Sequence, residues 1–443
     1  MKLPSSVNVL LLGGGGREHA IAKSIAKSNR INNLYIAPGN GGTQNEGTNI
    51  ELSVSNFASI KQFVISNNIN LVVVGPEEPL VLGIEDFFLN DDDIKYIPVV
   101  GPSFEAAKLE GSKQFAKDFM ERHSIPTAAY KTFSNQNIAE ANNFLDSLSA
   151  PYVLKANGLA AGKGVVILDD LKAAKAELSA MLDGKFGQAS KKVVIEEFLK
   201  GIELSVFVAL DGKNYKILPT AKDYKRALDG DKGLNTGGMG AVSPVPFADF
   251  EFMQKVEERI IKPTVNGLIQ EDIRYNGFIF IGLMNVDGDP YVIEYNVRLG
   301  DPETEVVVAR IESDIIDLFE GIVYQSLKTK ELKISDEYAV TVMCVAEGYP
   351  NSYNKGDKIT GIENVVESTV YQAGTKIDAS SNIVTSGGRV LCVTSKGKTI
   401  QEALTKSYES IDKIKYKGKN FRTDIGQDLI ALQKQNKTIK ITF

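Results

Sequence analysis

Apolar and polar residues alternate in two different ways along the first hundred residues. Residues 7–12 (VNVLLL) form a short apolar run typical of a buried strand, glycines occupy 13–16, and REHAIAKSIAKS follows with a helical pattern. NLYIAPGN and INLVVVGPEEPLVLGIEDFFL repeat the order of strand, loop and helix, and KYIPVVGPS predicts a last strand that ends near Gly101. This alternation predicts a parallel sheet covered by helices.

The pattern changes after AAKLEGSKQFAKDFMERHSIPTAAY, a predicted helix whose end is marked by proline. APYVLKANGLAAGKGVVILDD predicts strand, glycine loop and strand, and KKVVIEEFLKGIELSVFVALDG predicts two strands across a short turn. GFIFIGLMNVDGDPYVIEYNV predicts a hairpin, because Asp287-Gly288 is a tight-turn dipeptide between two apolar runs. The middle part is therefore expected to be antiparallel α+β. The section from about 335, with YAVTVMCVAEGYP and SGGRVLCV, predicts a small β-rich closing domain.

Composition and charge are those of an ordinary globular protein. The chain has 443 residues, 43% hydrophobic and 24% charged, with 50 basic and 56 acidic residues and a net charge of −6. This length exceeds one hydrophobic core, so we expect three or four domains or lobes. The absence of a long basic run argues against nucleic acid or an anionic membrane as a partner. No apolar run approaches the roughly 18 residues of a membrane span, and none has the form of a signal peptide.

Side chains that serve covalent catalysis or multi-histidine metal sites are scarce. The chain has two histidines, His19 and His123, no tryptophan, and two cysteines, Cys344 and Cys392, in apolar strand-like runs. These counts argue against a disulfide framework, a multi-histidine metal site and a Ser-His-Asp triad, and they predict a protein of the reducing cytoplasm. The chemistry is left to carboxylates, lysines, arginines and backbone amides.

The stretch VIEYNVRLGDPETEV places Glu294, Asn296 and Arg298 at alternate positions of a predicted strand, so all three share one face. Their neighbours on the other face are Ile293, Tyr295 and Val297. Glu294 and Asn296 offer hard oxygen ligands of the kind that Mg²⁺ prefers. Arg298 continues the row and suits a carboxylate or a phosphate. A pair between Glu294 and Arg298 without metal is the alternative, although it explains neither Asn296 nor the following GDPE.

The glycines of LLLGGGGREHA lie between a predicted strand and a predicted helix, where a phosphate can approach backbone amides and the helix N-terminus. A dinucleotide fingerprint fails here, because its third glycine would fall on His19 when counted from Gly14 and on Glu18 when counted from Gly13. The second strand also ends without an acidic residue for a ribose. We therefore favour a phosphate or phosphosugar site over NAD or FAD. A glycine turn that only allows tight packing stays open.

A second glycine loop, KANGLAAGKGVVI, is not a P-loop. Asn157 stands where the first glycine is needed, and Gly164 follows Lys163 where Ser or Thr is needed. A glycine loop between antiparallel strands can instead fold over phosphates as a flap that supplies amides and the Lys163 ammonium. A solvated hairpin tip is the alternative.

Two carboxylates, Glu196 and Glu197, end a buried apolar strand in VVIEEFLKGIELS. A buried acid is costly unless it has a partner. At least one of the two is therefore expected to face a ligand or cation. Two exposed acids at a strand end are the alternative.

Together these features resemble the ATP-grasp superfamily, and more narrowly the glycinamide ribonucleotide synthetase (phosphoribosylamine–glycine ligase) family. GGGGREHA, PGNGGT, VVVGPEEPLVLGI, LKANGLAAGKGVVI, AKDYKRALDGDKGLNTGGMGAVSP and RLGDPETEV stand in that family's order between residues 13 and 306. RLGDPE is the signature, and AVTVMCVAEGYP in the closing part also looks like the family's. One departure is Leu234, where the pattern has proline; it removes no polar group.

The resemblance implies an α/β and α+β multidomain fold in three parts. These are a Rossmann-like N-terminal domain over 1–108, a two-lobed ATP-grasp core over 109–334 with its flap lobe at about 120–195, and a small β-rich C-terminal domain over 335–443. It also implies an ATP-dependent ligase of de novo purine biosynthesis. Such an enzyme joins glycine to 5-phosphoribosylamine through glycyl phosphate and gives glycinamide ribonucleotide, ADP and phosphate.

That reaction suits the composition. Phosphorylating a carboxylate requires charge neutralisation and alignment of two substrates rather than a protein nucleophile. A closing flap keeps water from the acyl phosphate.

The resemblance also assigns individual residues. For ATP they are Lys113, Lys155, Gly162, Lys163, Gly164, the adenine hinge Glu196, Glu197, Phe198 and Leu199, and Glu203 for the ribose. For Mg²⁺ or Mn²⁺ they are Glu294 and Asn296. For the other substrates they are Gly15, Gly16, Arg17, Glu18, Asn40, Glu77, Asp223, Lys225, Arg298, Gly300 and Asp301. Within the last set, Arg298 with Asp223 is expected to bind glycine, and the N-terminal loops to bind phosphoribosylamine. Arg298 and Lys155 are the catalytic candidates.

We expect a cytoplasmic monomer that acts on small molecules and contacts neither nucleic acid nor membrane. Two alternatives stay open at this point. One is another ATP-grasp ligase or carboxylase acting on a related purine intermediate, which would keep the ATP site and change the acceptor. The other is a nicotinamide-dependent oxidoreductase built on GGGGREH, against which the failed fingerprint already counts. A non-enzymatic binding module is disfavoured by so many phosphate-type loops in one chain.

Overall fold

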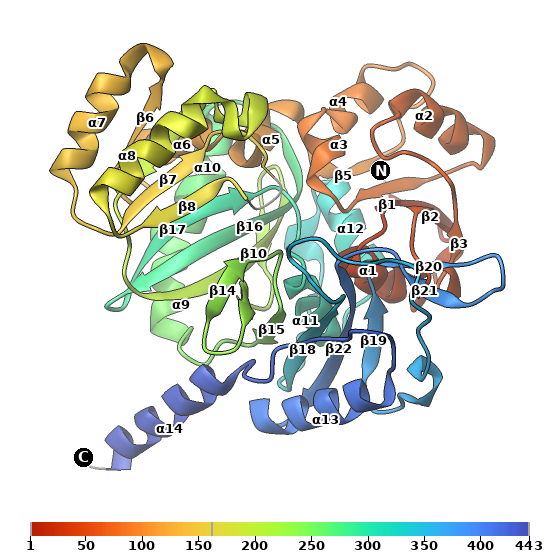
Figure 1. Ribbon diagram of the computed structural model, residues 1–443. Helices are drawn as coiled ribbons and strands as arrows, with labels where there is room; N and C mark the ends of the chain where they lie inside the picture. Colours follow the sequence, from red (N-terminus) through yellow and green to blue (C-terminus); the bar gives the residue numbers. More distant parts are fainter. Residues whose placement is uncertain (1, 161–162, 442–443) are drawn as a thin grey trace.

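The computed structural model describes residues 2–160 and 163–441. Its N-terminal part is the predicted parallel sheet, in the order β5-β4-β1-β2-β3 (Figure 1). The strands are β1 (Val7–Gly13), β2 (Ile31–Pro38), β3 (Thr48–Asn49), β4 (Leu71–Val74) and β5 (Val99–Pro102). The helices are α1 (Gly16–Ala26), α2 (Phe57–Ser66), α3 (Glu77–Val81) and α4 (Ile84–Leu89). Each apolar run became a strand because the layer buries it on both faces.

The N-terminal sheet does not end at its last parallel strand. Gly101 and Pro102 of β5 pair antiparallel with Asn276 and Tyr275 of β16, so the sheet continues into the core in the order β5-β16-β10-β11, with β17 also paired to β16. A Cβ at Gly277 would lie 3.2 Å from the Gly101 Cα, so this crossing has no room for a side chain. The sequence predicts both halves of this sheet but not their junction.

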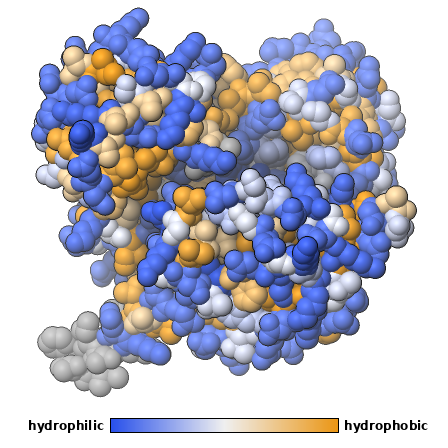
Figure 2. Space-filling view, in the orientation of Figure 1, coloured by the Kyte–Doolittle hydropathy of each residue, from blue (hydrophilic) through white to orange (hydrophobic). Residues whose placement is uncertain are grey.

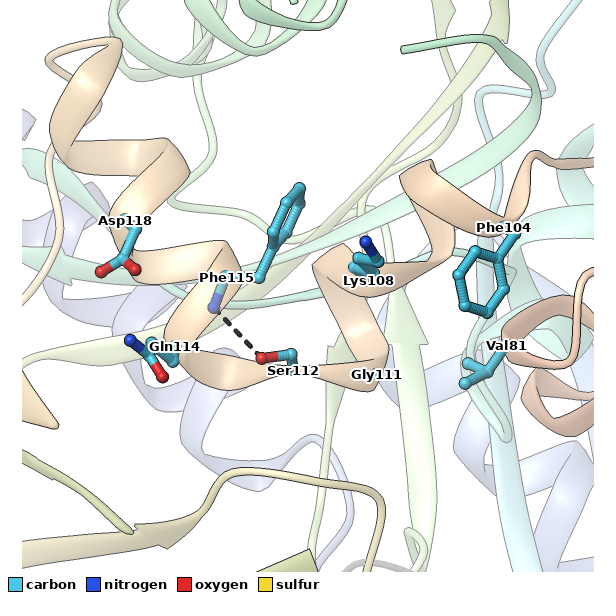
Figure 3. Close-up of a pocket in the computed structure, with 8 residues that line it drawn as sticks. All are labelled: Val81, Phe104, Lys108, Gly111, Ser112, Gln114, Phe115 and Asp118. Carbon is cyan, nitrogen blue, oxygen red and sulfur yellow. Dashed lines mark hydrogen bonds between the residues drawn. The ribbon is translucent and has the colours of Figure 1, made fainter. Parts of the chain in front are cut away.

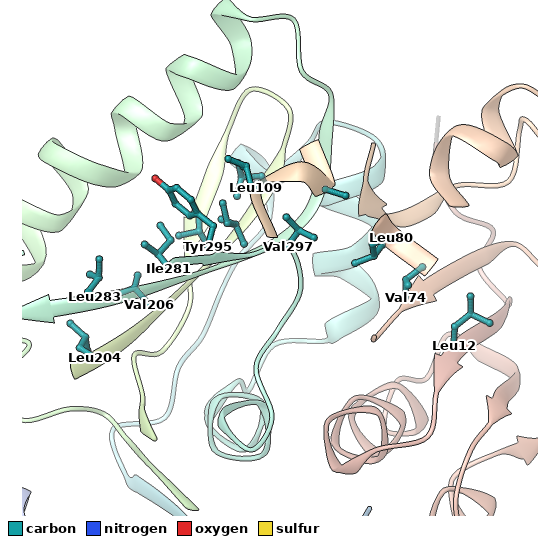
Figure 4. Packing of buried hydrophobic residues seen from close by; sticks show 14 of the residues in the cluster. Leu12, Val74, Leu80, Leu109, Leu204, Val206, Ile281, Leu283, Tyr295 and Val297 are labelled. Atoms are coloured by element: carbon teal, nitrogen blue, oxygen red, sulfur yellow. The ribbon is translucent and has the colours of Figure 1, made fainter. Parts of the chain in front are cut away.

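The core combines an antiparallel part of this sheet with several helices. Its strands are β10 (Ile202–Asp211), β11 (Tyr215–Ile217), β16 (Tyr275–Val286) and β17 (Asp289–Asn296). Its helices are α5 (Phe104–Gly111), α6 (Lys113–Arg122), α9 (Phe250–Val256), α10 (Lys262–Gln270), α11 (Glu303–Arg310) and α12 (Ile315–Val323). Figure 4 shows the buried packing between this sheet and α5, with Val206, Ile281 and Leu109 among the labelled residues.

The predicted hairpin of β16 and β17 is confirmed, with one irregularity. Asp287 and Gly288 both have positive φ, 51° and 87°, as a two-residue hairpin turn requires. Glu294 pairs with Gly282 but Val292 pairs with Leu283, so Ile293 is an extra, bulged residue. Tyr295 and Val297 lie in the core as expected, whereas Ile293 is half-buried and Val292 takes its place in the core.

The flap lobe is a separate four-stranded sheet, in the order β6-β9-β7-β8, with helices α7 and α8 packed on it (upper left in Figure 1). Its elements are β6 (Tyr130–Ser134), α7 (Ile138–Ser147), β7 (Tyr152–Ala156), β8 (Val165–Leu168), α8 (Leu171–Ala180) and β9 (Lys192–Glu196). The predicted pair β7–β8 around the glycine loop is confirmed. The strands β9 and β10 are also present, but they belong to different sheets, so residues 197–201 connect the flap lobe to the core.

The closing sheet has the order β12-β15-β18-β22-β19. Its strands are β12 (Lys222–Asp223), β15 (Gly240–Ser243), β18 (Tyr338–Val345), β19 (Thr369–Gln372) and β22 (Arg389–Gly397). β12 and β15 come from the middle of the chain, and the other three strands come from residues after 335. Both of these parts of the chain therefore build the closing sheet. The short hairpins are β13 (Arg226–Leu228) with β14 (Lys232–Asn235) and β20 (Thr375–Ile377) with β21 (Ile383–Thr385). Helix α13 (Ile400–Lys413) packs on the sheet and α14 (Gln427–Ile441) projects from the body (Figure 1).

Three expectations from the sequence bear on the whole molecule. Cys344 and Cys392 are both free and buried, in agreement with the absence of a disulfide framework. In the part of the chain that the structure describes, no helix has the length and apolar character to cross a membrane. The boundaries 1–108, 109–334 and 335–443 stay predictions.

Leu234 lies in β14 with an exposed side chain, so proline would be the more restrictive residue there.

We predict that Ile281→Ala lowers the free energy of unfolding by about 2–5 kcal/mol, because it opens a cavity in the centre of the core. Ile281 is fully buried on β16, where it packs in the cluster shown in Figure 4. Urea unfolding followed by circular dichroism measures the loss. Ile269→Ala on α10 is the matched control, because Ile269 is 49% exposed; it should change the free energy by less than about 0.5 kcal/mol. Equal effects of the two variants would contradict this view of the core.

Candidate active site

Charged side chains from the N-terminal sheet, the core and the closing sheet converge at the carboxyl ends of β1, β4 and β17. Arg17 follows β1, Glu77 follows β4 and Arg298 follows β17. Ligands of open α/β sheets bind at such strand ends. In Figure 2, which has the orientation of Figure 1, the surface is hollowed between the upper lobes and the lower part of the molecule.

Arg298 is held by carboxylates from two different helices. Its Nη2 donates to Glu110 Oε1 at 2.9 Å and to Asn296 Oδ1 at 3.1 Å, and its Nε lies 3.6 Å from Glu77 Oε2. Glu110 also accepts from the Val297 amide at 2.8 Å, so it fixes both the backbone and the side chain of this segment. The buried Arg298 Nε has no hydrogen-bond partner among the described residues. The guanidinium is therefore positioned with one donor still to be satisfied.

The alternative of a metal-free pair between Glu294 and Arg298 is not what the structure shows. In the described part of the chain, Arg298 makes its ion pairs with Glu110 and Glu77. Burial raises the pKa of Glu294, but Lys225, Lys113, Lys155 and Arg298 outweigh it, and the pKa is lowered. Glu294 thus remains an ionised carboxylate in a field of cations.

Arg17 and Asp301 join the N-terminal glycine loop to the RLGDPE segment. Arg17 Nε donates to Glu18 Oε1 at 2.6 Å and Nη1 donates to the Leu299 carbonyl at 3.1 Å. The Arg17 amide, in the first turn of α1, donates to Asp301 Oδ2 at 3.4 Å. Burial lowers the pKa of Arg17, but Glu18, Asp301 and Glu77 raise it more, so the guanidinium stays charged. The structure brings these predicted substrate residues together with Arg298.

The glycines before α1 make room for a carboxylate of the chain itself. Glu18 Oε2 accepts from the Gly15 amide at 2.6 Å, and a Cβ at Gly13 or Gly75 would lie within 2.4 Å of the Glu18 side chain. A Cβ at Gly15 would meet Glu18 Oε2 at 2.9 Å and Asp301 Oδ2 at 3.1 Å. The tight-packing interpretation of these glycines therefore holds for part of the loop. Gly16 similarly packs against Glu305.

Asn40 ties three segments together. Its Nδ2 donates to the carbonyls of Gly14 at 3.0 Å and Gln372 at 2.7 Å, and its Oδ1 accepts from the amides of Gly42 and Thr43. All of its side-chain hydrogen-bonding capacity is used within the chain. This arrangement positions the glycine loop against the closing sheet, and contact of Asn40 with a substrate stays a prediction.

Lys155 on β7 belongs to a buried cluster with Glu196 on β9. Glu196 Oε2 accepts from Lys155 Nζ at 2.9 Å and pairs with Lys117 Nζ at 3.1 Å, while Glu196 Oε1 is buried without a partner among the described residues. Lys117 also donates to Thr127 Oγ1 at 2.8 Å. Burial lowers the pKa of Lys117 to about 8, although Glu196 opposes the shift. The interpretation of two exposed acids is thus wrong for Glu196 and correct only for Glu197, which is exposed.

The predicted adenine hinge borders a cavity of about 590 Å³ between the flap lobe and the β16–β17 hairpin. Its lining residues are Glu197, Phe198, Leu199, Lys200, Gly201, Ile202, Val286, Asp287 and Tyr291. Phe198 is 40% exposed, so an apolar ring faces open space at this edge. An apolar ring beside this connecting segment suits a planar base.

The second glycine loop is anchored at its base. Asn157 Oδ1 accepts from the Gln114 amide at 2.8 Å, and the Asn157 carbonyl accepts from the Lys113 amide at 2.9 Å, so the loop caps the N-terminus of α6. The Gly164 carbonyl accepts from the Ala156 amide at 2.7 Å, and Lys163 is exposed. Gly162 lies outside the described residues. The loop therefore starts beside Lys113, as a phosphate site shared by the two would require.

Glu203, Asp223 and Lys225 form a mixed cluster near the metal candidates. Lys225 Nζ lies 2.7 Å from Glu203 Oε2 and 3.9 Å from Asp223 Oδ2. The attraction of Lys225 lowers the pKa of Glu203, whereas burial raises the pKa of Asp223. Lys225 also acts on Glu294. The structure thus brings the predicted ribose acid and the predicted substrate residues onto the Glu294 side of the site.

Glu294 and Asn296 fit a divalent cation that brings other ligands with it. Among the described residues, no group of three or more His, Cys, Asp or Glu side chains could hold a metal alone. Mg²⁺ usually takes one or two protein oxygens and completes its shell with water and phosphate. The Asn296 amide is buried, with Nδ2 unpartnered among the described residues. Its Oδ1 accepts from Arg298 Nη2 at 3.1 Å, so a cation held by Asn296 would share this oxygen with the guanidinium.

Two positioning residues, Lys117 and Glu110, were missed by reasoning from sequence. Both interrupt the apolar face of a helix: Lys117 lies three positions before the buried Met120, and Glu110 three positions after the buried Ala107. A charged residue at a buried helical position was the signal that could have identified them.

A further cavity of about 390 Å³ lies between α3, α5 and α6 (Figure 3). Its lining residues are Val81, Phe104, Lys108, Gly111, Ser112, Gln114, Phe115 and Asp118. The Lys108 ammonium lies 5.5 Å from the Phe104 ring centre and 5.9 Å from that of Phe115. Its polar groups are occupied by neighbours in the chain, since Asp118 accepts from Tyr130 and Gln114 from Lys192. We assign no ligand to this cavity.

Glu303 and Glu305, at the start of α11, are buried acids close to the site. Burial, followed by the charge of Asp223, raises the pKa of Glu303 to about 8. Burial and Asp301 raise the pKa of Glu305 well above its ordinary value, and Glu305 Oε2 has no partner among the described residues. A Cβ at Gly300 would lie 2.5 Å from Glu303 Oε2, so the GDPE turn folds closely around this acid.

Comparisons with known proteins agree with this geometry. Three domain families match the chain: the N domain of phosphoribosylglycinamide synthetase over residues 7–110, its ATP-grasp (A) domain over 111–304 and its C domain over 339–428. The chain is 42% identical to a phosphoribosylamine–glycine ligase of Pasteurella multocida, over 97% of this chain and 100% of that protein. It is 44% identical to a bifunctional purine biosynthetic protein of Schizosaccharomyces pombe, over 98% of this chain and 55% of that protein. A solved structure of phosphoribosylamine–glycine ligase from Thermotoga maritima superposes with a TM-score of 0.81 at 38% identity, over 94% of this chain and 100% of that chain.

We predict that Glu303→Gln flattens the pH dependence of stability between pH 5 and 8. The folded-state pKa of about 8 lies above the ordinary 4.5, so the folded state binds more protons in this window and loses stability as pH rises through it. Removing this group should reduce the slope by up to about 1.4 kcal/mol per pH unit. Urea unfolding at pH 5, 6, 7 and 8 measures it. Glu331→Gln is the exposed control and should leave the slope unchanged; identical slopes for all three proteins would contradict the buried, protonated Glu303.

Proposed function

The chain belongs to the phosphoribosylglycinamide synthetase family, and from this premise we infer that it is an ATP-dependent ligase joining glycine to 5-phosphoribosylamine in purine biosynthesis. The observation that carries the inference is the convergence of Lys155, Glu294 and Arg298 with Arg17 and Glu77 of the N-terminal sheet. Cations for a triphosphate, ligands for a metal and anchors for two further substrates meet at one place. Neither a carboxylase acceptor nor a nicotinamide site is needed to account for these residues.

The chemistry follows from the poor leaving group of a carboxylate. A glycine carboxylate oxygen attacks the γ-phosphorus of ATP, and the bond to ADP breaks as the bond to the carboxylate forms. The amine of 5-phosphoribosylamine then attacks the glycyl carbon of this acyl phosphate, phosphate leaves, and the amine gives up one proton. Both steps need alignment and charge neutralisation more than covalent help.

The two ATP-site lysines carry the first part of that task. Lys155 is held within hydrogen-bond distance of Glu196 and of the Ile293 carbonyl, which directs it from the flap lobe toward β17. Lys113 stands at the first position of α6, where the helix dipole also favours an anion. We assign both to the phosphates of ATP. Mg²⁺ or Mn²⁺ held by Glu294 and Asn296 would neutralise charge on the same phosphates.

We assign glycine to Arg298 and Asp223, and phosphoribosylamine to the N-terminal loops. The support for the first is that Arg298 lies two residues past Asn296 and has an Nε without a hydrogen-bond partner among the described residues. The support for the second is that Arg17 and Glu77 face the same space, where burial raises the pKa of Glu77 but Arg298 and Arg17 lower it further. The two substrates would then meet between β17 and the carboxyl ends of β1 and β4.

We also propose that the protein works as a cytoplasmic monomer on small molecules only. The net charge of −6 and the even mixture of signs support a surface without affinity for nucleic acid or anionic membrane.

The deciding experiment is ADP release from ATP, Mg²⁺ and glycine, with and without freshly made 5-phosphoribosylamine. We expect release that depends on both substrates, with glycinamide ribonucleotide as the product. Release with bicarbonate or formate in place of glycine would instead indicate a related ligase or carboxylase.

We predict that Glu294→Gln combined with Asn296→Ala abolishes turnover while the protein stays folded, because both side chains face the site. ADP formation at millimolar Mg²⁺ and Mn²⁺ measures the loss, and circular dichroism checks the fold. Glu331→Gln, on the surface, should keep normal turnover. Near-normal ADP formation by the double variant would remove these two residues from the metal site.

We predict that Arg298→Lys lowers kcat/KM for glycine by about ten- to a hundredfold, the loss expected for a charge-assisted contact. Lysine keeps the charge but cannot contact Glu110 and a substrate carboxylate with separate nitrogens of a planar fork. The effect on phosphoribosylamine should be smaller. Steady-state kinetics with each substrate varied in turn makes the comparison, with Arg259→Lys, an exposed ion-paired arginine, as control. A loss confined to phosphoribosylamine would reverse the two assignments.

A further inference from the structure

Arg389, on β22 of the closing sheet, contacts two loops that belong to the other parts of the molecule. Its Nη1 donates to the carbonyls of Gly237 and Asp301, both at 2.7 Å, and its Nη2 lies 3.1 Å from Asp301 Oδ1. One guanidinium thus binds the backbone of the TGGMG loop and both the backbone and the side chain of the GDPE turn. No other described side chain bridges these two motifs by hydrogen bonds or ion pairs.

The amide and the carbonyl of Gly237 both form hydrogen bonds with side chains of the closing part, which comprises residues 335–443. Its carbonyl accepts from Arg389, and its amide donates to the hydroxyl of Tyr349 at 3.2 Å. A Cβ at Gly237 would lie 2.9 Å from the Arg389 Cζ, and a Cβ at Gly238 would lie 2.4 Å from Pro302 Cδ. The two glycines are required because the guanidinium and the GDPE turn press directly on this backbone.

Both loops lead directly to substrate-site residues. Asp301 Oδ2 accepts from the amide of Arg17 in the first turn of α1. On the other side, the Thr236 amide donates to the Lys225 carbonyl at 2.8 Å, and the Met239 amide donates to the Tyr224 carbonyl at 2.7 Å. The segment that carries Asp223 and Lys225 is therefore fixed relative to the start of α1 through Arg389.

We propose that Arg389 is a positioning residue for glycine and phosphoribosylamine, through which the closing part sets the geometry of a site that lies outside it. The proposal rests on the proposed function, since it concerns those two substrates. Among the described residues, Arg389 makes no hydrogen bond or ion pair with Lys113, Lys155 or Lys163, which belong to α6 and the flap lobe. Replacing Arg389 should therefore impair the use of phosphoribosylamine and glycine without weakening the binding of ATP.

The test compares Arg389→Ala, Arg389→Lys and Tyr349→Phe with the unchanged protein. For Arg389→Ala we expect kcat/KM for phosphoribosylamine and glycine to fall about ten- to a hundredfold, with the Kd of a non-hydrolysable ATP analogue changed by less than about threefold. Added guanidinium chloride at millimolar concentration should restore part of the rate, because it can occupy the space between Gly237 and Asp301. Arg389→Lys should retain an intermediate rate.

Tyr349→Phe keeps the ring and removes only the hydroxyl that accepts from the Gly237 amide. It therefore tests the same loop in case the Arg389→Ala variant does not fold. A rise of about threefold in KM for either substrate is expected. Lys396→Ala is the matched control, since Lys396 lies on the same strand and pairs with Glu337 away from the site. It should leave all constants unchanged.

Equal losses of ATP-analogue binding and substrate binding would overturn the proposal, as would unchanged kinetics in both Arg389→Lys and Tyr349→Phe. Absence of activity in the unchanged protein would instead count against the proposed function, so the two failures are distinguishable.

Discussion

Compensation of buried charge is the constraint on which this site depends. An isolated carboxylate or ammonium is too costly to bury, and several of the buried charged groups here are held by a group of opposite sign on another element. Glu196 lies between Lys155 and Lys117, Glu110 holds Arg298, and Asp301 holds Arg389. Among the described residues, a few buried polar atoms near the site have no hydrogen-bond partner, including Glu196 Oε1, Asn296 Nδ2 and Arg298 Nε. Under the proposed function, these atoms lie where bound substrates would supply the missing partners.

The sequence predicted those parts of the fold that local patterns determine. The parallel strands, the β7–β8 pair and the Asp287-Gly288 turn all follow from periodicity and turn chemistry within about twenty residues. The junction of β5 with β16, the bulge at Ile293 and the recruitment of β12 and β15 to the closing sheet involve residues far apart in the chain. No periodic pattern carries that information, because each depends on which sheet edge remains free after the others have formed.

The site shows the same division between residues that local motifs identify and residues whose contacts lie far apart in the chain. Motifs identified Glu294, Asn296, Arg298 and Lys155, and the structure brings them together with Arg17 and Glu77. The glycines of GGGGREHA were expected to admit a phosphate, whereas at Gly13 they make room for the chain's own Glu18. Lys117 and Glu110 were missed because each occupies a single buried position without a motif. Arg389 could not have been found, since its importance comes from contacts with Gly237 and Asp301, which lie 152 and 88 residues away in the chain.

The shared sheet has a mechanical consequence. Strand pairing through Gly101 and Asn276 makes the N-terminal part and the core one body, and β12 and β15 join the closing part to it. The flap lobe has its own sheet, and residues 123–129 and 197–201 are its two chain connections to the core. At Gly201 a Cβ would lie 2.1 Å from the Asn285 carbonyl oxygen, so this connection is a close backbone crossing. If the flap lobe moves about these two connections, Lys155 and Lys163 move with it, whereas Lys113 on α6 and the residues proposed to anchor the other two substrates stay with the core.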